Sequence, residues 1–490
     1  MGLELFVIIL GIITYFVIKQ SVATITKTPV WLLWLVIMSP AFIWTGWSLA
    51  YGQDARMPVI LVLGPFLISP ILYWWLVDKG RIKPSQNQPS AVEKTEPIPP
   101  IPKPVSVRPI TADEEKSLRD CFPWGVYYLQ NIDYRPQAIL CRGKLRSPAE
   151  KAYEVIKENV EKVFGDRFLV LLQESIQGQP FFALVANPGN KSAQSKNIDL
   201  FERPIFALIL LILTLFTTTL AGVEISGQSL AKLQGDGTIW LKALPYSLGI
   251  ITILGIHELS HYFAAVHYKI KTTLPHFLPI PFFLGTFGAF IQMKSPIPHR
   301  KALFDISIAG PLGGFIITLP LLLWGLSLSE VVAIDPKSSL LSFDSLNPRF
   351  SFLFALLAKS ALGSGLTVGK AIDLHPLAVA GYMGLIVTAL NLMPVGQLDG
   401  GHIVHAMYGQ KTAIVIGQIT RFLMLGLALV EPDLLLWAIL LLFMPVADQP
   451  ALNDVTELDN KRDLLGLFSL VLLLMILLPL PGAIASWLSI

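Results

Sequence analysis

Two histidines and a glutamate in one apolar stretch have the residue types and the spacing of a metal site. His257, Glu258 and His261 lie within the apolar run 243–268. On an α-helix, residues four apart lie on one face, one turn apart, so both imidazoles could bind the same ion. Glu258 lies about 100° around the helix from His257, near enough to take a proton from metal-bound water. The spacing predicts a zinc site with Glu258 as general base.

The alternative is a structural histidine pair. Ionisable side chains in a membrane-length apolar helix are costly to bury unless they face partners, and they usually mark functional sites. We therefore favour the metal site over the structural pair.

Two histidines leave a catalytic zinc one protein ligand short. Asp399 is the strongest candidate, because it follows an apolar span and precedes two glycines that allow close backbone approach. The alternative role for Asp399 is to cap the following helix. Asp305 is an outside candidate for ligand or supporting residue, and His402 and His405 could be supporting donors.

The composition predicts a polytopic membrane protein. Of the 490 residues, 53% are hydrophobic and only 14% are charged. The net charge of +3 is too small to indicate nucleic-acid binding. Cys121 and Cys141 form neither a disulfide framework nor a zinc ribbon, so we expect reduced thiols packed in a small domain.

Polarity divides the chain into five regions. We expect an all-α polytopic membrane protein, a multi-pass helical bundle, with a small soluble α/β domain inserted between N-terminal helices and the core. The N-terminal apolar segment lacks a basic leader, so we interpret it as a retained helix rather than a cleaved signal. The regions are a three-helix membrane region (1–78), a proline-rich linker (79–110), the soluble α/β domain (111–200), the membrane core (204–450) and a C-terminal transmembrane helix (464–490).

Within the soluble domain, the pattern predicts helices at 112–119 and 148–164 and strands at 138–142, 168–172 and 181–185. Thr111 and Glu114 form a capping-box pattern before the first helix, and Ser147 is the expected start of the second.

Within the core, prolines and glycines interrupt the stretch 272–299, which predicts a re-entrant hairpin with a strand at 285–293 beside the metal. Basic loop residues collect on one side of the membrane, which places the soluble domain and the mouth of the site in the cytoplasm. The expected spans are 204–222, 243–268, 303–328, 377–394, 414–430 and a short, doubtful one at 434–445.

Two motifs resemble those of the site-2 protease family of intramembrane metalloproteases. HELSH (257–261) is similar to the family's HExxH helix, and NLMPVGQLDGG (391–401) is similar to its second motif. The stretches RGKLR (142–146) and TFGAFIQMKSPIPHRKALFDISIAGPLGG (286–314) resemble the cyanobacterial and chloroplast branch related to the EGY proteins.

The resemblance implies one Zn²⁺ per chain bound by His257, His261 and Asp399, with Glu258 as base. It also places Asn391 near the active site, to support the oxyanion or hold the substrate strand; an inter-helix hydrogen bond is the equal alternative.

These observations predict an intramembrane zinc endopeptidase that cleaves transmembrane segments of membrane proteins, with single-span regulatory proteins as the substrate class. A helical substrate must unwind, and it could pair with the segment that contains Gly285, Phe287, Gly288, Phe290 and Gln292. The expected location is the plasma or thylakoid membrane of a bacterium, with a cyanobacterium favoured. Alternatives are a metal-ion transporter, whose ligands should occur in several spans, and a silent scaffold, which has no need of Glu258. Oligomeric state is not predicted.

Overall fold

A computed structural model describes most of the chain in two units, Met1–Pro102 and Lys103–Ile490. The first of the three expected N-terminal helices and the proline-rich linker lie almost entirely outside the described residues. Apart from isolated positions before residue 28, the described residues are 28–51, 59–80, 110–135, 138–175, 178–187, 203–228, 237–280, 284–335, 339–430 and 434–490.

The first unit contains two packed helices, α2 (Val30–Tyr51) and α3 (Val59–Lys79). The Thr28 hydroxyl donates a 2.8 Å hydrogen bond to the Leu76 carbonyl and joins the start of α2 to the end of α3. Both helices coincide with apolar segments expected to cross the membrane.

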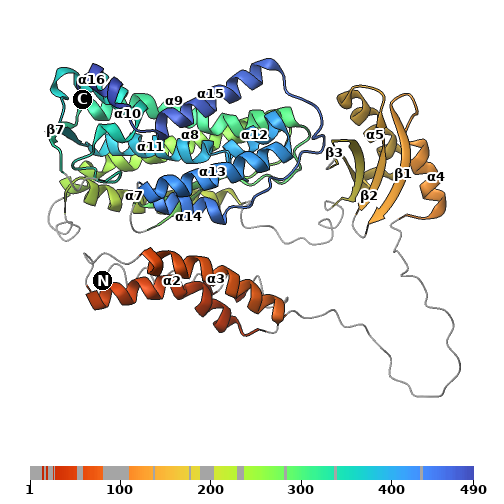
Figure 1. The fold of residues 1–490 in the computed structure, drawn as a ribbon, viewed down its shortest axis with the longest axis horizontal. Coiled ribbons are helices and arrows are strands. Elements are labelled where there is room, and N and C mark those ends of the chain that lie inside the picture. Colours follow the sequence, from red (N-terminus) through yellow and green to blue (C-terminus); the bar gives the residue numbers. More distant parts are fainter. Residues whose placement is uncertain are drawn as a thin grey trace. The chain divides into compact units, whose positions relative to one another are not determined.

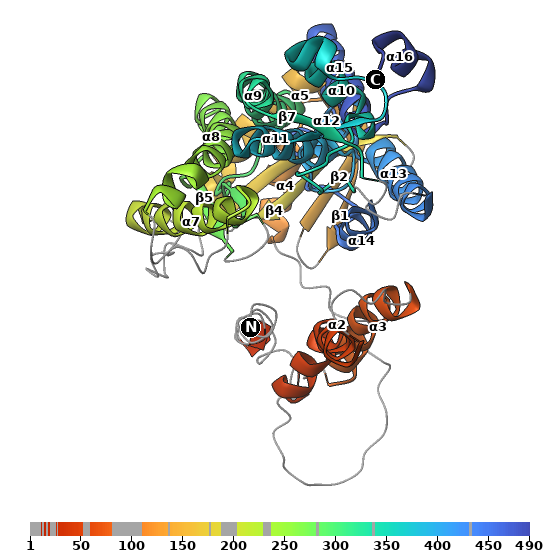
Figure 2. The ribbon, with the colours of Figure 1, turned by 90° about the vertical axis from the view of Figure 1, so that its left-hand side faces the viewer.

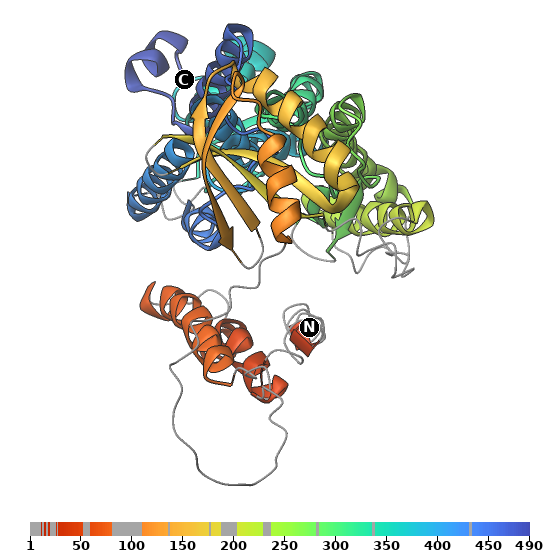
Figure 3. The ribbon, with the colours of Figure 1, turned by 90° about the vertical axis from the view of Figure 1, so that its right-hand side faces the viewer.

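The second unit begins with a small α/β domain. Its antiparallel sheet has the order β1-β2-β4-β3, and α4 and α5 lie across one face of it (Figure 3). Cys121 and Cys141 are free and buried in this core, as expected. The elements are α4 (Ala112–Asp120), β1 (Tyr127–Arg135), β2 (Ala138–Leu145), α5 (Ala149–Phe164), η1 (Gly165–Arg167), β3 (Phe168–Glu174) and β4 (Pro180–Ala186).

One of the two helix starts expected in this domain is confirmed. Thr111 and Glu114 form the predicted capping box of α4. The expected Ser147 cap is wrong, because Pro148 occupies the N-cap of α5 and no side chain caps it. Strand β1 was not predicted, because a bulge between Leu129 and Asn131 interrupts its alternating pattern.

The rest of the second unit is mostly helical (Figure 1). Helix α8 lies between α7 and α9 (Figure 2), and α11 packs against both α8 and α9. The helices are α7 (Pro204–Ile225), α8 (Thr238–His267), α9 (Arg300–Ser327), α10 (Phe352–Leu362), α11 (Pro376–Leu392), α12 (Asp399–Tyr408), α13 (Gln410–Val430), α14 (Leu435–Phe443), α15 (Asn460–Leu477) and α16 (Gly482–Leu488).

Within the described residues, five helices are long and apolar enough to cross a membrane: α2, α7, α8, α9 and α13. The predicted C-terminal helix at 464–490 is wrong as a single element. The chain bends by 76° between α15 and α16, where Pro479 and Pro481 prevent a continuous helix. The expected spans at 377–394 and 434–445 are shorter helices, with 17 residues in α11 and nine in α14.

Two short two-stranded sheets complete the core. Strands β5 (His276–Pro279) and β6 (Thr286–Phe290) are antiparallel, which confirms a hairpin within the proline-rich stretch. Strands β7 (Glu330–Ala333) and β8 (Lys370–Asp373) pair across a segment that contains η4 (Pro348–Phe350), α10 and η5 (Gly363–Gly365).

Candidate active site

Three side chains from two helices bring their donor atoms together. His257 and His261 lie on α8, and Asp399 is the first residue of α12. The two Nε2 atoms are 3.2 Å apart. Asp399 Oδ2 lies 3.5 Å from His257 Nε2 and 3.3 Å from His261 Nε2. This is the one group of metal-binding side chains found among the described residues.

These separations fit one metal ion. Four ligands placed tetrahedrally at zinc–ligand bond lengths are separated from one another by about 3.3 Å, and the three measured distances bracket that value. Two imidazoles and one carboxylate are also a donor set that catalytic zinc takes. The capping alternative for Asp399 is wrong, because Leu398 is the N-cap of α12 and Asp399 faces the histidines.

Helix α9 orients His261. The Nδ1 of His261 lies 2.7 Å from the Ile306 carbonyl, to which it donates, so the lone pair of Nε2 is left for a metal. Helix α9 can come this close because residue 310 is glycine: an added Cβ would collide with the His261 ring. The packing of α9 on α8 therefore acts directly on a metal-ligand candidate.

Glu258 is buried beside the donor group. Its side chain is on α8 between the two histidines and is 7% exposed. The backbone N–H of Ile291, directly after β6, faces the Glu258 carboxylate. The hairpin therefore contacts the residue expected to be the base.

The loop between α11 and α12 delivers Asp399. The close approach expected at Gly400 is present, because an added Cβ would collide with the Leu392 carbonyl. This contact folds the loop back onto the end of α11, so Asp399 returns toward α8.

Comparisons with known proteins agree with this geometry. Residues 245–429 match peptidase family M50, and residues 116–192 match the EGY3 middle domain. The chain is 37% identical over 246 residues to "Probable zinc metalloprotease EGY1, chloroplastic" of Arabidopsis thaliana, covering 50% of this chain and 44% of that protein. It is 30% identical over 369 residues to "Probable zinc metalloprotease EGY2, chloroplastic" of the same plant, covering 74% and 64%.

Over residues 245–429 the chain is similar to peptidase family M50, the site-2 proteases. A third relative, "Probable zinc metalloprotease EGY3, chloroplastic" of Oryza sativa subsp. indica, is 26% identical over 383 residues, which cover 75% of this chain and 64% of that protein. The chain thus spans 44% to 64% of the length of these relatives. The resemblance seen in the motifs is confirmed, including its EGY-like branch.

Asn391 lies beside the donor group, within the part of the chain that matches family M50. Its amide nitrogen is 3.3 Å from His257 Nε2. The contact joins α11 to α8, and it places the amide beside the donor group. Both expected roles, a bond between helices and a contact with substrate, are compatible with this position.

Asp305 is not a metal ligand in this geometry. It accepts hydrogen bonds from Arg462 Nε at 2.8 Å and Nη2 at 2.6 Å, and from the Tyr268 hydroxyl at 2.5 Å. It therefore ties α15 and the end of α8 to α9, one residue before Ile306. The ligand expectation is wrong because these donors occupy the carboxylate.

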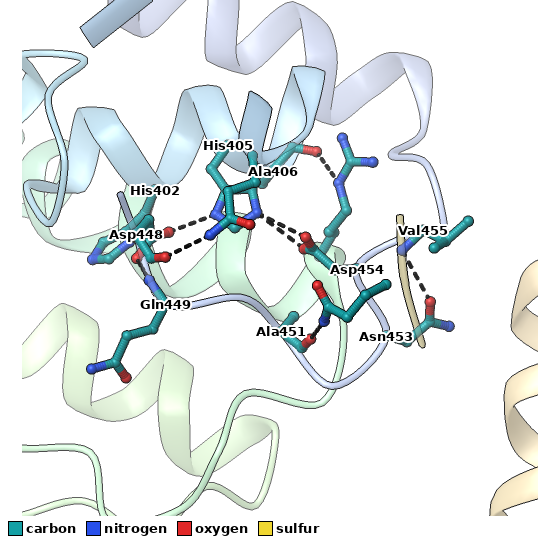
Figure 4. A network of polar contacts seen from close by, with 12 residues as sticks. His402, His405, Ala406, Asp448, Gln449, Ala451, Asn453, Asp454 and Val455 are labelled. Carbon is teal, nitrogen blue, oxygen red and sulfur yellow. Dashed lines mark hydrogen bonds and ion pairs between the residues drawn. The ribbon is translucent and has the colours of Figure 1, made fainter. Parts of the chain in front are cut away.

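His402 and His405 do not contact Asp399 as supporting donors. His405 instead lies between two aspartates that follow α14 (Figure 4). Its Nδ1 is 2.7 Å from Asp448 Oδ2, and its Nε2 is 3.1 Å from Asp454. His402 Nδ1 is 2.8 Å from Asp448, without hydrogen-bond alignment. No sequence pattern indicated these pairs, because the aspartates lie in an irregular segment between α14 and α15.

Burial and charge set the protonation of this cluster. Burial alone would lower the pKa of His405, but hydrogen bonds to Asp448 and Asp454 raise it to about 9. Burial alone would raise the pKa of Asp448, but His402 and His405 lower it to about 2. At neutral pH His405 is therefore a buried cation that lies between Asp448 and Asp454.

Proposed function

We propose that this protein is an intramembrane zinc endopeptidase of the site-2 type. The observation that carries the proposal is the group formed by His257, His261 and Asp399, at zinc-ligand spacing, with Glu258 beside it on a membrane-length helix. The printed names of the curated relatives also describe zinc metalloproteases.

His257, His261 and Asp399 would hold one zinc ion per chain. When bound, zinc acidifies a water molecule and polarises the scissile carbonyl. The Ile306 carbonyl keeps the proton of His261 on Nδ1, so Nε2 stays available. Glu258 takes the proton of the attacking water and passes it to the leaving amine.

Asn391 would position the substrate. Once His257 Nε2 is used as a ligand, the Asn391 amide is free to donate to the substrate carbonyl or to hold the substrate strand.

The hairpin would hold an unwound substrate segment as an added strand. Strand β6 is paired with β5 along one edge, and Phe287 is 78% exposed. The proposed pairing segment contains Gly285, Phe287, Gly288, Phe290 and Gln292, next to the Ile291 contact with Glu258. The substrate class would be transmembrane segments of single-span regulatory proteins.

A photocrosslinking amino acid tests this pairing. Placed at Phe287, it should link to a bound single-span substrate. Placed at Phe422, a similarly exposed residue of α13 (68%), it should not. Equal crosslinking at both positions would contradict a substrate-binding hairpin.

We also propose a multi-pass helical bundle with the soluble domain and the mouth of the site in the cytoplasm. The support is the charge of the loops, since Lys269, Lys271 and Arg300 lie at helix ends on that side. The proposed location is the plasma or thylakoid membrane of a bacterium. The alternative is a chloroplast membrane, because the printed names of the relatives contain the word "chloroplastic".

Cleavage in reconstituted vesicles tests the activity. Wild-type protein should cut members of a panel of single-span proteins, and Glu258→Gln should not cut them at equal metal content. Zinc flux through wild-type vesicles without any cleavage would favour a transporter instead.

A further inference from the structure

The segment that follows α14 joins the soluble domain to the core. Leu172 of β3 donates a 2.7 Å bond to the Leu452 carbonyl, and the Asp454 N–H donates a 2.9 Å bond to the Leu172 carbonyl. Strand β3 is at the edge of its sheet, so residues 452–454 cover that edge as an added strand. Leu452 and Val455 also pack against the core of the soluble domain.

The same segment is bonded to the start of α9. Leu452 and Asn453 donate to the carbonyls of Ile297 and Pro298 at 2.9 Å and 3.0 Å. Residues 452–454 thus lie between the sheet and the residues that precede Arg300. Asn453 and Asp454 are only 2% and 7% exposed, as expected for an interior link rather than a surface loop.

The side chains of this segment hold helix α12. Asp448 and Asp454 contact the two ring nitrogens of His405 from opposite sides (Figure 4). The side chain of His405 is fully buried. The buried Arg300 donates a 2.8 Å bond to the carbonyl of the next residue, Ala406. Asp454 therefore contacts β3 through its backbone and α12 through its carboxylate.

Helix α12 also carries Asp399. It has ten residues and begins with Asp399, and His405 lies about 9 Å further along the axis. A helix this short moves as a rigid rod, so a shift or rotation at His405 also displaces the Asp399 carboxylate.

We propose that Asp454 and His405 are positioning residues that couple the placement of the soluble domain to the metal ligand Asp399. This inference rests on the proposed function, and it deepens it by giving the soluble domain a regulatory role. A partner that pulls β3 away from residues 452–454 would release His405 and loosen metal binding. The soluble domain would then set the activity of the site without contributing a group to it.

Metal affinity tests the coupling independently of cleavage. In the full-length protein in detergent, Asp454→Asn and His405→Ala should each weaken Co²⁺ or Zn²⁺ binding about 10-fold or more, as expected for a residue that supports a ligand. The Co²⁺ absorption spectrum should shift as well, because it reports ligand geometry. Glu457→Gln, an exposed acid on the same segment, should change neither.

The double variant Asp454→Asn/His405→Ala tests whether the two residues act together, and hydrogen exchange provides the folding control. If the two residues act as one link, the loss should be close to that of either single variant. Hydrogen exchange should rise in α12 and remain low in α7, which separates a local release from global unfolding.

Unchanged affinity, spectrum and exchange in the Asp454 variant would overturn the coupling. A wild-type protein that binds zinc and loses cleavage with Glu258→Gln would still support the protease in that case. A wild-type protein that binds no metal would overturn the proposed function itself, and the coupling with it.

Discussion

The environment of each ligand candidate depends on single atoms of neighbouring helices. The Ile306 carbonyl selects the tautomer of His261, and the absence of a side chain at Gly310 leaves room for the ring. Asn391 and Glu258 flank the same donor group. The chemistry of the site is therefore sensitive to changes that add one carbon atom.

Gly310→Ala should weaken metal binding by about 10-fold or more, since its methyl group would push the His261 ring from its position. Equilibrium binding of Zn²⁺ against a competing chelator measures the loss. Gly426→Ala in α13, where an added Cβ would contact nothing within 4 Å, is the matched control. Equal affinity of both variants would show that α9 can move aside.

The charge of His405 should make stability depend on pH. Its pKa is raised from 6.5 to about 9, so its stabilising effect is complete below about pH 6.5 and is lost as the pH rises through about 9. The shift corresponds to a free energy on the order of 3 kcal/mol. Loss of the bonds to Asp448 is not expected on the acid side until the pH falls toward 2.

Thermal unfolding of wild type and His405→Gln measures this effect. The difference in melting temperature should be large at pH 6.5 and should narrow by pH 9.5, as the wild-type imidazole loses its proton. Glu457→Gln should keep the wild-type profile. A difference that is constant with pH would mean that His405 is already neutral at pH 6.5.

Individual elements differ in how far the sequence predicts them. The spacing of His257 and His261 specifies one helix face, and the prolines around 285–293 indicate the hairpin, so α8 and β5–β6 were predicted. The break between α15 and α16 was also encoded, in Pro479 and Pro481, but the apolar run concealed it. Strand β1 was missed because its bulge disturbs the period of two.

The small α/β domain should keep both thiols unreactive. Burial raises the pKa of Cys141 to about 12 and that of Cys121 to about 11, so almost no thiolate exists at neutral pH. N-ethylmaleimide should label neither residue at pH 7.5 in the folded protein and both in denaturant. Lys151→Cys, exposed on α5, should be labelled at once. Rapid labelling of Cys141 in the folded state would contradict a packed domain.

For the whole second unit, sequence patterns predicted the metal-ligand candidates but not the contacts that hold these residues in place. HELSH and NLMPVGQLDGG predict the metal ligands because their spacing is local and their types are specific. The contacts of Asp454 with Leu172 and His405, and of Asp305 with Arg462, join residues far apart in the chain. The periodicity of apolar residues along a helix or strand does not indicate such contacts, so only the folded structure shows how α12 and α9 are held.

Zinc content and cleavage measured together on three proteins test the central claim most directly. Wild type should bind one zinc ion and cut a single-span substrate. Glu258→Gln should bind zinc equally and lose cleavage, since only the proton acceptor is removed. Asp399→Asn should lose most of its zinc, because a charged ligand is replaced by a weak one. Cleavage retained by Glu258→Gln, or full zinc content in Asp399→Asn, would contradict the assignment of base or ligand.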